Sequence, residues 1–401
     1  MSKVYIVAAK RSAIGSFQGS LAPLSSSDLG AAIAKQVIAE TKIDPANFDE
    51  VVIGNVLQAG QSQGVGRQVG IKSGVPQEVP GWTVNIICGS GMKSIIYANT
   101  AIKAKEADLV LAGGVESMSN APFLAPASIR KGFKMGDLTL KDHMVFDALT
   151  DAYNKYHMGI TAENIAEKYG ITRKDQDDFA YASQQKAIAA IDAGKFKDEI
   201  IPVAVPGKKG DTIVDTDEYP NRKTTPEILA GLKPAFKKDG TVTAGNASGL
   251  NDGASITIIA SEEAVEKYNL KPLAEIVSTG IGGVDPKIMG MGPVPATGMA
   301  LKRAGLALKD IELIELNEAF AAQSLGVITE FIAQHGVTKE WIAERTNVNG
   351  GAIALGHPVG VSGNRIVVTL LYEMKKRGLT YGLASLCIGG GMGTAVIIKN
   401  L

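Results

Sequence analysis

Residues 85–94 read NIICGSGMKS, and they place one of only two cysteines, Cys88, between a short apolar run and a Gly-Ser-Gly turn. The residues before Cys88 are strand-like, and the sequence from Met92 onward has a helical pattern. We therefore expect a strand–turn–helix unit with Cys88 at the N-terminal end of the helix. The unpaired amides and partial positive charge there favour the thiolate, the nucleophilic form of cysteine. A small buried hydrophobe is the alternative interpretation of the same residue.

The layout of this unit recurs near the C-terminus. The stretch that begins VNIICGSGMKS and the stretch that begins VNGGAIALGHPVGVSG each contain Val-Asn, a short strand, a glycine turn, a helix, a second strand and a group of glycines. In this overlay Cys88 falls near His357. The repeat predicts two copies of one α/β unit whose equivalent turns face each other.

Short β-branched runs recur along the chain, with helical patterns between several of them. The runs are near-continuous rather than alternating, as is typical of strands buried on both faces. We expect α/β layers around a largely parallel sheet. The expected strands include 4–7, 51–53, 109–111, 256–259, 276–277, 311–314 and 395–398, and the expected helices include 27–40, 92–105 and 364–376.

Residues 120–243 differ from the rest because they contain no comparable run of buried strands. Two helices are indicated there, one opening at Thr161 and one opening at Thr172 with a Thr-x-x-Asp capping pattern. We interpret this region as a lobe inserted into the first α/β unit. The expected domains are an N-terminal half of residues 1–119 plus 244–270, an inserted loop domain of residues 120–243 and a C-terminal half of residues 271–401.

The composition excludes several classes of function. The 401 residues include 41 Lys and Arg against 41 Asp and Glu, a balance that argues against a nucleic-acid or acidic-membrane partner recognised through global charge. Two cysteines cannot form a disulfide scaffold, so we expect a reducing compartment, the cytoplasm. No stretch approaches 18 consecutive strongly apolar residues, which predicts no membrane span. No close His, Cys, Asp or Glu spacing indicates a metal site.

Three further residues could do chemistry. His357 lies in GHPVGVSG, where it could act as a general base or donate to an oxyanion; a histidine satisfied in a loop is the alternative. Cys387 lies in SLCIGGGMG, either as a core cysteine or beside glycine amides free to approach a ligand. Asn317 opens NEAFAAQ, either as a helix N-cap or as the holder of a catalytic water. None of the glycine clusters fits a dinucleotide fingerprint or a P-loop.

Taken together, NIICGSGMKS, NEAFAAQ, VNGGAIALGHPVGVSG and CIGGGMG resemble the thiolase family, and the similarity runs from Val4 to near the C-terminus. The HMG after Tyr156, the block NASGLNDGA and Met289 in KIMGMGP are most similar to the biosynthetic members. The resemblance implies the thiolase fold, with two similar α/β halves in a five-layer αβαβα arrangement and an inserted loop lobe. It also implies a homotetramer built as a dimer of dimers, with residues 118–144 as the tetramer loop and GQSQGVGRQ near the dimer interface.

The resemblance further implies a reversible condensation of two acetyl-CoA to acetoacetyl-CoA and coenzyme A, with coenzyme A as substrate and product and no other cofactor. Cys88, activated by His357, would take the acetyl group of the first acetyl-CoA. Cys387 would remove a proton from the methyl carbon of the second, and the carbanion would attack the acetyl group. His357 with a water held by Asn317 would form one oxyanion site, and the amides of Cys88 and Gly389 the other.

The family's coenzyme A contacts carry over to Leu149, His157, Phe236, Ala244, Ser248, Ala319 and Phe320. Met158 and Met289 would shape a small acyl pocket, since methionine walls leave little room for a long chain. Two positions depart from the family pattern: Arg222 stands one place along from the usual arginine near the nucleotide end, and Ile228 replaces a serine. The segment 329–341 is also longer than usual.

Three other functions compete with this hypothesis. A longer-chain 3-ketoacyl-CoA thiolase would keep all the catalytic residues, and only the small pocket argues against it. A condensing enzyme of the ketoacyl-synthase kind lacks a thiol base, so Cys387 argues against that class. A non-catalytic acyl-CoA-binding or scaffold protein is disfavoured because all four chemical residues are present.

Overall fold

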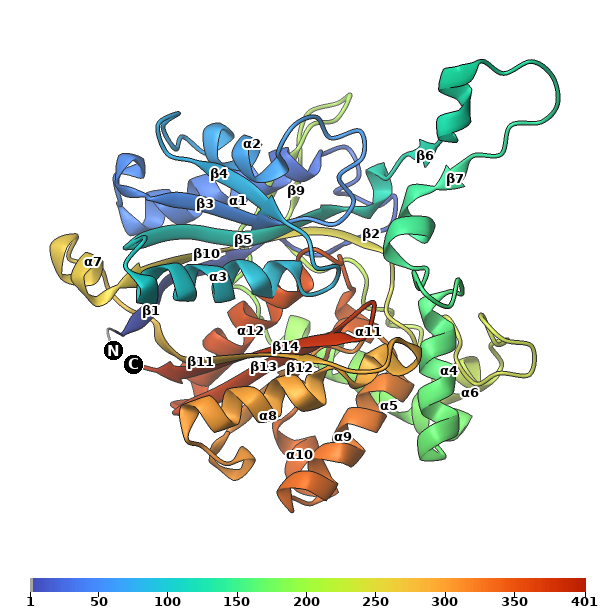
Figure 1. The fold of residues 1–401 in the computed structure, drawn as a ribbon. Coiled ribbons are helices and arrows are strands. Elements are labelled where there is room, and N and C mark those ends of the chain that lie inside the picture. Colours follow the sequence, from blue (N-terminus) through green and yellow to red (C-terminus); the bar gives the residue numbers. More distant parts are fainter. Residues whose placement is uncertain (1–2) are drawn as a thin grey trace.

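The computed structural model describes residues 3–401, and its helices and strands form five layers (Figure 1). Two sheets lie one above the other, with one pair of helices between them and further helices on each outer face. The first half consists of β1 (Val4–Arg11), β2 (Gly15–Ser16), α1 (Ser26–Thr41), β3 (Glu50–Gly54), α2 (Val65–Lys72), β4 (Gly81–Val84), α3 (Ser90–Ala104), β5 (Leu109–Ser117), β10 (Asn251–Ser261) and α7 (Glu262–Lys267).

The second half follows a similar order with one strand fewer in its sheet. It consists of β11 (Ala274–Gly283), α8 (Pro293–Ala304), β12 (Leu313–Leu316), α9 (Ala321–His335), α10 (Lys339–Arg345), α11 (Ala352–Leu355), α12 (Ser362–Arg377), β13 (Tyr381–Ile388) and β14 (Met392–Asn400). Helices α3 and α12 form the central layer, α1 and α2 cover the first sheet, and α8 and α9 cover the second (Figure 1). The five-layer arrangement of two similar halves is therefore confirmed.

The sheets are mixed, so the expectation of a largely parallel sheet was wrong. The first sheet has the order β1-β10-β5-β3-β4, and the second has the order β11-β14-β13-β12. Pairs joined through a helical crossover are parallel (β3 with β4 and β5, β12 with β13), whereas β10 and β14 run antiparallel to both neighbours. The apolar runs that indicated parallel strands reflect burial on both faces, which is independent of strand direction. A short antiparallel pairing of β1 with β11 joins the two sheets edge to edge.

Burial on both faces divides each strand between two cores. In β14, Val396 and Ile398 face the central layer, and Ala395 and Ile397 face the outer helices α8 and α9. The strands of the first sheet are divided in the same way between the central core and the outer core under α1. Each fully buried aliphatic side chain contributes about 1.5–3 kcal/mol relative to an exposed one. The sheets and the central helices therefore hold one another in place.

The central helices approach each other through glycines at their N-termini. A Cβ placed on Gly363 of α12 would lie 2.5 Å from the backbone nitrogen of Met92 in α3. A Cβ on Gly91 would lie 2.8 Å from the carbonyl oxygen of Gly360. No side chain fits in this contact. The two turns that precede the helices are consequently held side by side.

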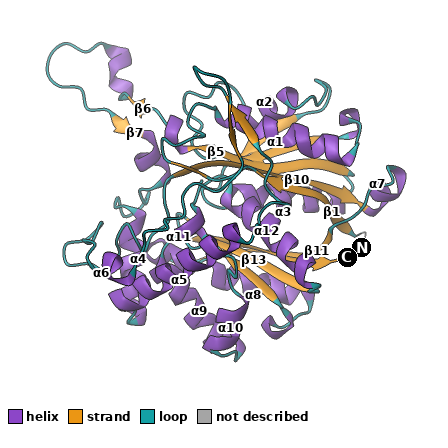
Figure 2. Cartoon of the chain, turned by 180° about the vertical axis from the view of Figure 1, so that it is seen from behind, coloured by secondary structure: helices purple, strands orange, loops and turns teal. Residues whose placement is uncertain are grey.

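A lobe connects β5 to β10 and carries the remaining elements (Figure 2). These are β6 (Phe123–Leu124), β7 (Lys141–Asp142), a π-helical turn (Met144–Ala148), α4 (Met158–Tyr169), α5 (Arg173–Asp192), β8 (Val203–Val205), β9 (Thr212–Val214) and α6 (Pro226–Ala230). Thr172 caps α5 with Asp175 completing the predicted capping box. The start predicted for α4 at Thr161 was wrong, because the N-cap is His157, whose Nδ1 accepts a hydrogen bond from the Gly159 amide.

The lobe stands at a place where the second half has only a tight turn. Strands β5 and β13 are equivalent, and so are β10 and β14; β13 turns directly into β14 at residues 389–391. The sequence-based expectation of an insertion that interrupts the first unit agrees with this arrangement, while the domain boundaries themselves stay predictions. Within residues 3–401, no helix is long and apolar enough to cross a membrane.

Replacing Gly363 by Ala should destabilise the protein by about 1–3 kcal/mol, because the added methyl group overpacks the contact between α3 and α12. Gly298→Ala is the matched control: Gly298 lies within α8, and a Cβ there meets no atom within 4 Å. That variant should gain about 0.5–1 kcal/mol from helix propensity. The melting temperatures of the two variants test this prediction. Equal melting temperatures would show that the contact between α3 and α12 does not require a glycine at position 363.

Candidate active site

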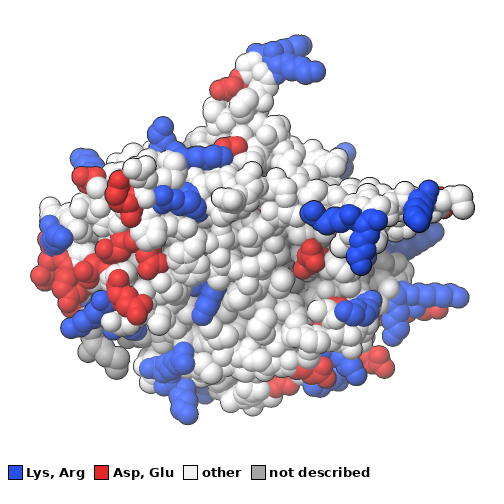
Figure 3. Space-filling view, turned by 45° about the horizontal axis from the view of Figure 1, so that its top comes forward, with Lys and Arg blue, Asp and Glu red and all other residues white. Residues whose placement is uncertain are grey.

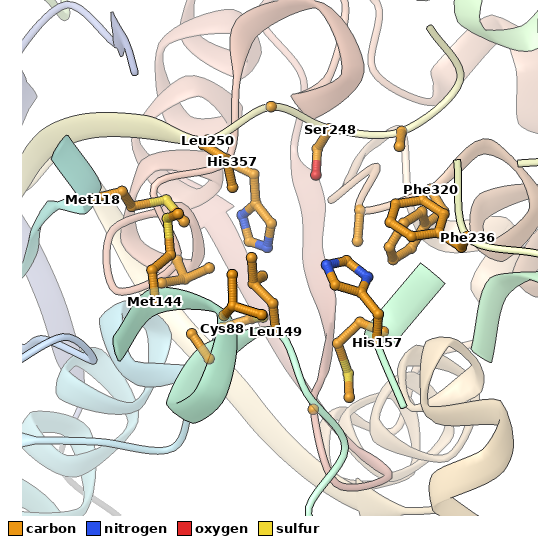
Figure 4. Close-up of a pocket in the computed structure, with 18 of the residues that line it drawn as sticks. Cys88, Met118, Met144, Leu149, His157, Phe236, Ser248, Leu250, Phe320 and His357 are labelled. Carbon is orange, nitrogen blue, oxygen red and sulfur yellow. The ribbon is translucent and has the colours of Figure 1, made fainter. Parts of the chain in front are cut away.

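A cavity of about 390 Å³ brings the predicted residues together (Figure 4). Cys88, His357 and Gly389 line it. Nine of the ten expected coenzyme A and acyl contacts line it too, namely Leu149, His157, Met158, Phe236, Ala244, Ser248, Met289, Ala319 and Phe320. Figure 4 shows the imidazole of His357 beside Cys88, with His157 next to them.

The turn that carries Cys88 has a strained backbone. Ile87, a β-branched residue, adopts a positive φ of 53°, a conformation that costs of order 1–3 kcal/mol. Side chains on both sides hold it there. Asn85 Oδ1 accepts the Ile87 amide at 2.9 Å, and Ser90 Oγ donates to the Ile87 carbonyl at 2.6 Å. Cys88 therefore lies two residues before the first residue of α3, at the N-terminal end of that helix, as the sequence predicted.

Burial opposes ionisation of the Cys88 thiol. Desolvation raises its pKa to about 11, although the backbone amides of Gly389 and of Cys88 itself act in the opposite direction. The expectation that the helix N-terminus alone would yield a thiolate is therefore not met in the free protein. Since the thiol keeps its proton at neutral pH, a base must remove it during the reaction.

His357 is oriented as such a base. Its Nδ1 lies 2.5 Å from Ser362 Oγ, and Ser362 donates its own proton to the Pro358 carbonyl at 3.1 Å. Ser362 Oγ must then accept a hydrogen bond from the Nδ1–H group, which leaves Nε2 as the bare, proton-accepting nitrogen. This Nε2 is buried and has no hydrogen-bond partner among the described residues. Burial, with the charge of Arg365, lowers the pKa of His357 to about 4, so the ring is neutral at pH 7.

Two buried polar residues that the sequence analysis missed hold the turn that carries His357 against the first half. Asn251 Oδ1 accepts the amide of His357 at 2.9 Å. Glu116 accepts the amide of Gly360 at 2.9 Å and also binds the backbone after β3. Burial raises the pKa of Glu116 to about 7 against the effect of these amides. The sequence did contain a signal for both residues, namely a polar side chain inside an otherwise apolar strand: Glu116 in LAGGVES and Asn251 in SGLNDGA.

Cys387 lies behind the wall of the cavity rather than on its surface. It is fully buried near the end of β13, in a cluster with Met158, Met289, Ala319 and Phe320, all of which line the cavity. Burial raises the pKa of its thiol, and a negative charge on Cys88 would raise it further. The residues next to the two cysteines are in contact, since a Cβ on Gly89 would lie 2.3 Å from Cδ1 of Ile388. Cys387 therefore holds its proton firmly when no substrate is bound.

Asn317 does not cap a helix, so that interpretation was wrong. Strand β12 ends one residue before it, and the N-cap of α9 is Phe320. Asn317 is completely buried, yet neither its Oδ1 nor its Nδ2 has a hydrogen-bond partner among the described residues. Such unpaired groups are costly in an interior, which fits an amide that serves a water or a ligand.

One end of the cavity is aromatic and partly polar. The rings of His157 and Phe236 stack with centroids 4.5 Å apart, and Phe320 meets Phe236 edge-on at 6.1 Å. Because Nδ1 of His157 accepts the Gly159 amide, its Nε2 carries the proton and can donate into the cavity. The hydroxyl group of Ser248 points toward the same space (Figure 4).

Arg222 is the expected contact that the structure does not bring to the cavity. Its guanidinium group forms an exposed ion pair with Asp192, at 2.5 and 3.0 Å. The cavity instead includes residues that the sequence analysis missed, among them Met118, Met144, Val145, Tyr219, Leu250 and Val359. Apolar residues in loops carry no sequence signal that distinguishes them from ordinary core. Among residues 3–401, no group of three or more His, Cys, Asp or Glu side chains could hold a metal ion.

The alkylation rate of Cys88 should report its raised pKa. In Cys387→Ala, Cys88 is the single cysteine, and its reaction with iodoacetamide should accelerate with rising pH up to at least pH 9, because the folded-state pKa is about 11. The urea-unfolded variant is the control and should level off near the ordinary thiol pKa of about 8.5. A plateau already present at pH 7 would instead indicate a preformed thiolate–imidazolium pair.

Comparison with known proteins gives one consistent result. The family model described as "Thiolase, N-terminal domain" matches residues 4–263, and that described as "Thiolase, C-terminal domain" matches residues 270–400. The chain is 54% identical over 401 residues to the acetyl-CoA acetyltransferase of Pseudomonas aeruginosa, with 100% of both chains covered.

Solved structures agree with the family models. The acetyl-CoA acetyltransferase of Syntrophomonas wolfei matches with a TM-score of 0.96 at 42% identity, and 100% of both chains is covered. Human mitochondrial 3-ketoacyl-CoA thiolase matches with a TM-score of 0.94 at 48% identity, covering 100% of this chain and 99% of that one. The five-layer fold and the family models together show that this chain belongs to the thiolase family.

Proposed function

We propose that the chain is an acetyl-CoA C-acetyltransferase that reversibly joins two molecules of acetyl-CoA into acetoacetyl-CoA and free coenzyme A. The observation that supports this most is one cavity lined by Cys88 and by His357 with its bare Nε2, with the second thiol, Cys387, packed directly behind lining residues of the same cavity. The name of the Pseudomonas aeruginosa relative is in agreement.

Acyl transfer begins at Cys88. His357 Nε2 takes the thiol proton as the sulfur attacks the thioester of the first acetyl-CoA, and the leaving coenzyme A sulfur takes that proton. The product is acetyl-Cys88. Ser362 keeps Nδ1 protonated throughout, so the same nitrogen acts as base and then as acid.

Condensation uses the second thiol. Once acetyl-Cys88 is neutral and a second acetyl-CoA is bound, Cys387 passes its thiol proton to His357 Nε2 and, as the thiolate, removes a proton from the methyl carbon. The resulting carbanion attacks the acetyl carbonyl, and the released Cys88 sulfur takes the proton from His357. His357 and a water on Asn317 stabilise the enolate oxygen, and the amides of Cys88 and Gly389 stabilise the tetrahedral intermediate. One such donor is typically worth roughly 100- to 1,000-fold in rate.

Coenzyme A would enter along the aromatic end of the cavity. The stacked ring of His157 and the hydroxyl of Ser248 are polar partners for the amides of a pantetheine arm, and the rings of Phe236 and Phe320 pack against its methylene groups. Coenzyme A is then substrate and product, with no further cofactor. Arg222 contributes to nucleotide binding only if its ion pair with Asp192 opens.

We further propose a homotetramer built through the arm of residues 118–144, which projects from the body of the lobe (Figure 1). The arm exposes large apolar side chains, including Phe123, Phe133 and Met135, of which Met135 is 94% exposed. Apolar side chains gathered on one projection are typical of a protein interface. On the face seen in Figure 3, many Asp and Glu residues gather at the left and several Lys and Arg residues at the right. The overall balance of 41 basic and 41 acidic residues argues against a nucleic-acid partner. We expect a cytoplasmic location, since both cysteines are free.

A longer-chain 3-ketoacyl-CoA thiolase is the second candidate. The solved human mitochondrial 3-ketoacyl-CoA thiolase is 48% identical over the whole chain, and it therefore supports this alternative. Both candidates use the same steps and differ only in the acyl group that Cys88 carries.

The purified protein should cleave acetoacetyl-CoA in the presence of coenzyme A into two molecules of acetyl-CoA. Loss of absorbance of the Mg²⁺–enolate of acetoacetyl-CoA measures the reaction, and Cys88→Ala is the control expected to remove it. Absence of turnover in the wild-type protein, with the Cys88 thiol titratable, would overturn the proposed function.

The variant Cys387→Ala should separate the two half-reactions. It should accept an acetyl group from acetyl-CoA on Cys88, visible as a mass increase on the intact protein, because acylation needs only His357. Condensation should fall by about a thousandfold or more, since a general base at carbon typically contributes about 100- to 10,000-fold. Normal condensation in this variant would exclude Cys387 as the base.

A further inference from the structure

We propose that a second cavity, formed between α5, α9 and α10, binds a small carboxylate with an apolar body about the size of a benzene ring. The cavity shares no lining residue with the active-site cavity, so this site is additional to the one at Cys88. The segment 329–341, which is longer than usual and has no part in the proposed reaction, forms the end of α9 and the start of α10. The chain thus has a ligand site that the proposed function does not use.

The position of the cavity leaves it open to solvent. The three helices lie side by side on the lower side of the molecule, and α9 contacts both of the others (Figures 1 and 2). The arm of residues 118–144 and α2, near which the dimer interface is expected, lie on the upper side of Figure 1. We therefore expect the cavity to stay accessible in the proposed homotetramer.

The size and the walls of the cavity suit a small apolar body. Its volume is about 160 Å³, and its walls are mostly apolar, with Phe179 from α5, Leu325 and Ile328 from α9, and Ile342 from α10. An apolar cavity of about 150 Å³ is large enough to bind benzene. A wider hollow of about 450 Å³ shares Phe179, Leu325 and Ile328 with the cavity and gives a ligand a way in from solvent.

Lys186 and Thr346 give the cavity a polar end. Lys186 Nζ donates to the Thr346 carbonyl at 3.3 Å, so the ammonium group lies beside a residue that also lines the cavity. Thr346 is 6% exposed, and its Oγ1 has no hydrogen-bond partner among residues 3–401. Buried polar atoms in proteins are usually paired. An ammonium group has three donors and a hydroxyl group one, so both side chains can donate to one carboxylate.

The two lysines that line the cavity, Lys186 and Lys339, favour an anion. Neither forms an ion pair within residues 3–401. The carboxylates in the first two turns of α5 are already used, because they pair with Arg173 and Lys174 or cap the helix. The positive charge at the cavity is therefore available to a ligand.

Glu318 is the single acidic side chain among the described residues that line the cavity. Its carboxyl group accepts hydrogen bonds from Ser183 Oγ at 2.6 Å, Asn347 Nδ2 at 2.8 Å and the Ile353 amide at 3.2 Å. Burial raises the pKa of Glu318, although these hydrogen bonds act in the opposite direction. Even when Glu318 is ionised, the two lysines leave the lining with a positive charge, which a carboxylate neutralises and an amine would increase.

Isothermal titration calorimetry of the full-length protein with benzoate tests this site. We expect saturable binding, at least about tenfold tighter than that of benzamide, a neutral molecule with the same ring, because hydrogen bonds to charged groups are the stronger ones. Saturating coenzyme A should not displace benzoate, since the two cavities have no residue in common.

Two variants locate the binding. Lys186→Gln removes the ammonium group and should weaken benzoate binding at least about tenfold. Ala343→Trp places an indole in the cavity from an exposed position of α10 and should abolish the binding. The matched control is Lys302→Gln, which removes the same charge from an exposed position of α8 and should bind benzoate as the wild-type protein does.

Melting temperatures close to that of the wild-type protein show that each variant is folded. The proposal is overturned if the folded wild-type protein shows no saturable benzoate binding, if benzamide binds as tightly as benzoate, or if coenzyme A displaces benzoate. It is also overturned if Lys186→Gln and Ala343→Trp both keep the wild-type affinity. None of these measurements requires turnover of acetoacetyl-CoA, so they decide this site separately from the proposed function.

Discussion

The contact between the N-termini of α3 and α12 is the constraint on which the active site depends. Gly91 and Gly363 leave no room for a Cβ between the two backbones. Each glycine weakens its own helix by about 0.5–1 kcal/mol, and the burial of both helices between two sheets offsets that cost. Because each helix is preceded by its own turn, the contact makes neighbours of two residues distant in sequence, Cys88 and His357. A looser contact would leave the base out of reach of the thiol.

Burial also determines the protonation states of Cys88 and His357. A raised pKa of Cys88 and a lowered pKa of His357 keep both groups neutral in the free protein. In the proposed reaction, the thiolate–imidazolium pair of Cys88 and His357 forms only as the thioester arrives, when the developing negative charge passes from sulfur to oxygen and meets fixed donors. Ser362 fixes the tautomer that this transfer requires.

Much of this could be predicted from sequence because it is local or repeated. Glycine placement and apolar runs predict the turn at Cys88 and the buried strands, and the Thr-x-x-Asp pattern predicts the capping box at Thr172. The overlay of the two repeated units predicts that Cys88 lies near His357. Strand direction could not be predicted, since burial on both faces looks alike in parallel and antiparallel strands. Nor could the roles of Glu116 and Asn251, because their partners are backbone amides brought close only by the folded chain.

The two halves repeat one unit, and the chemistry comes from the differences between equivalent positions. Equivalent turns provide Cys88 in the first half and His357 in the second. Near the ends of the equivalent strands β5 and β13 lie Glu116, a carboxylate that accepts the Gly360 amide in the turn of His357, and Cys387, a thiol behind the cavity wall. After β5 the chain opens into the lobe that shapes the cavity, whereas after β13 it turns within three glycines. The first half provides Cys88, the second half provides His357 and Cys387, and residues of both halves and of the lobe line the cavity, so the proposed reaction requires the two halves to fold as one body.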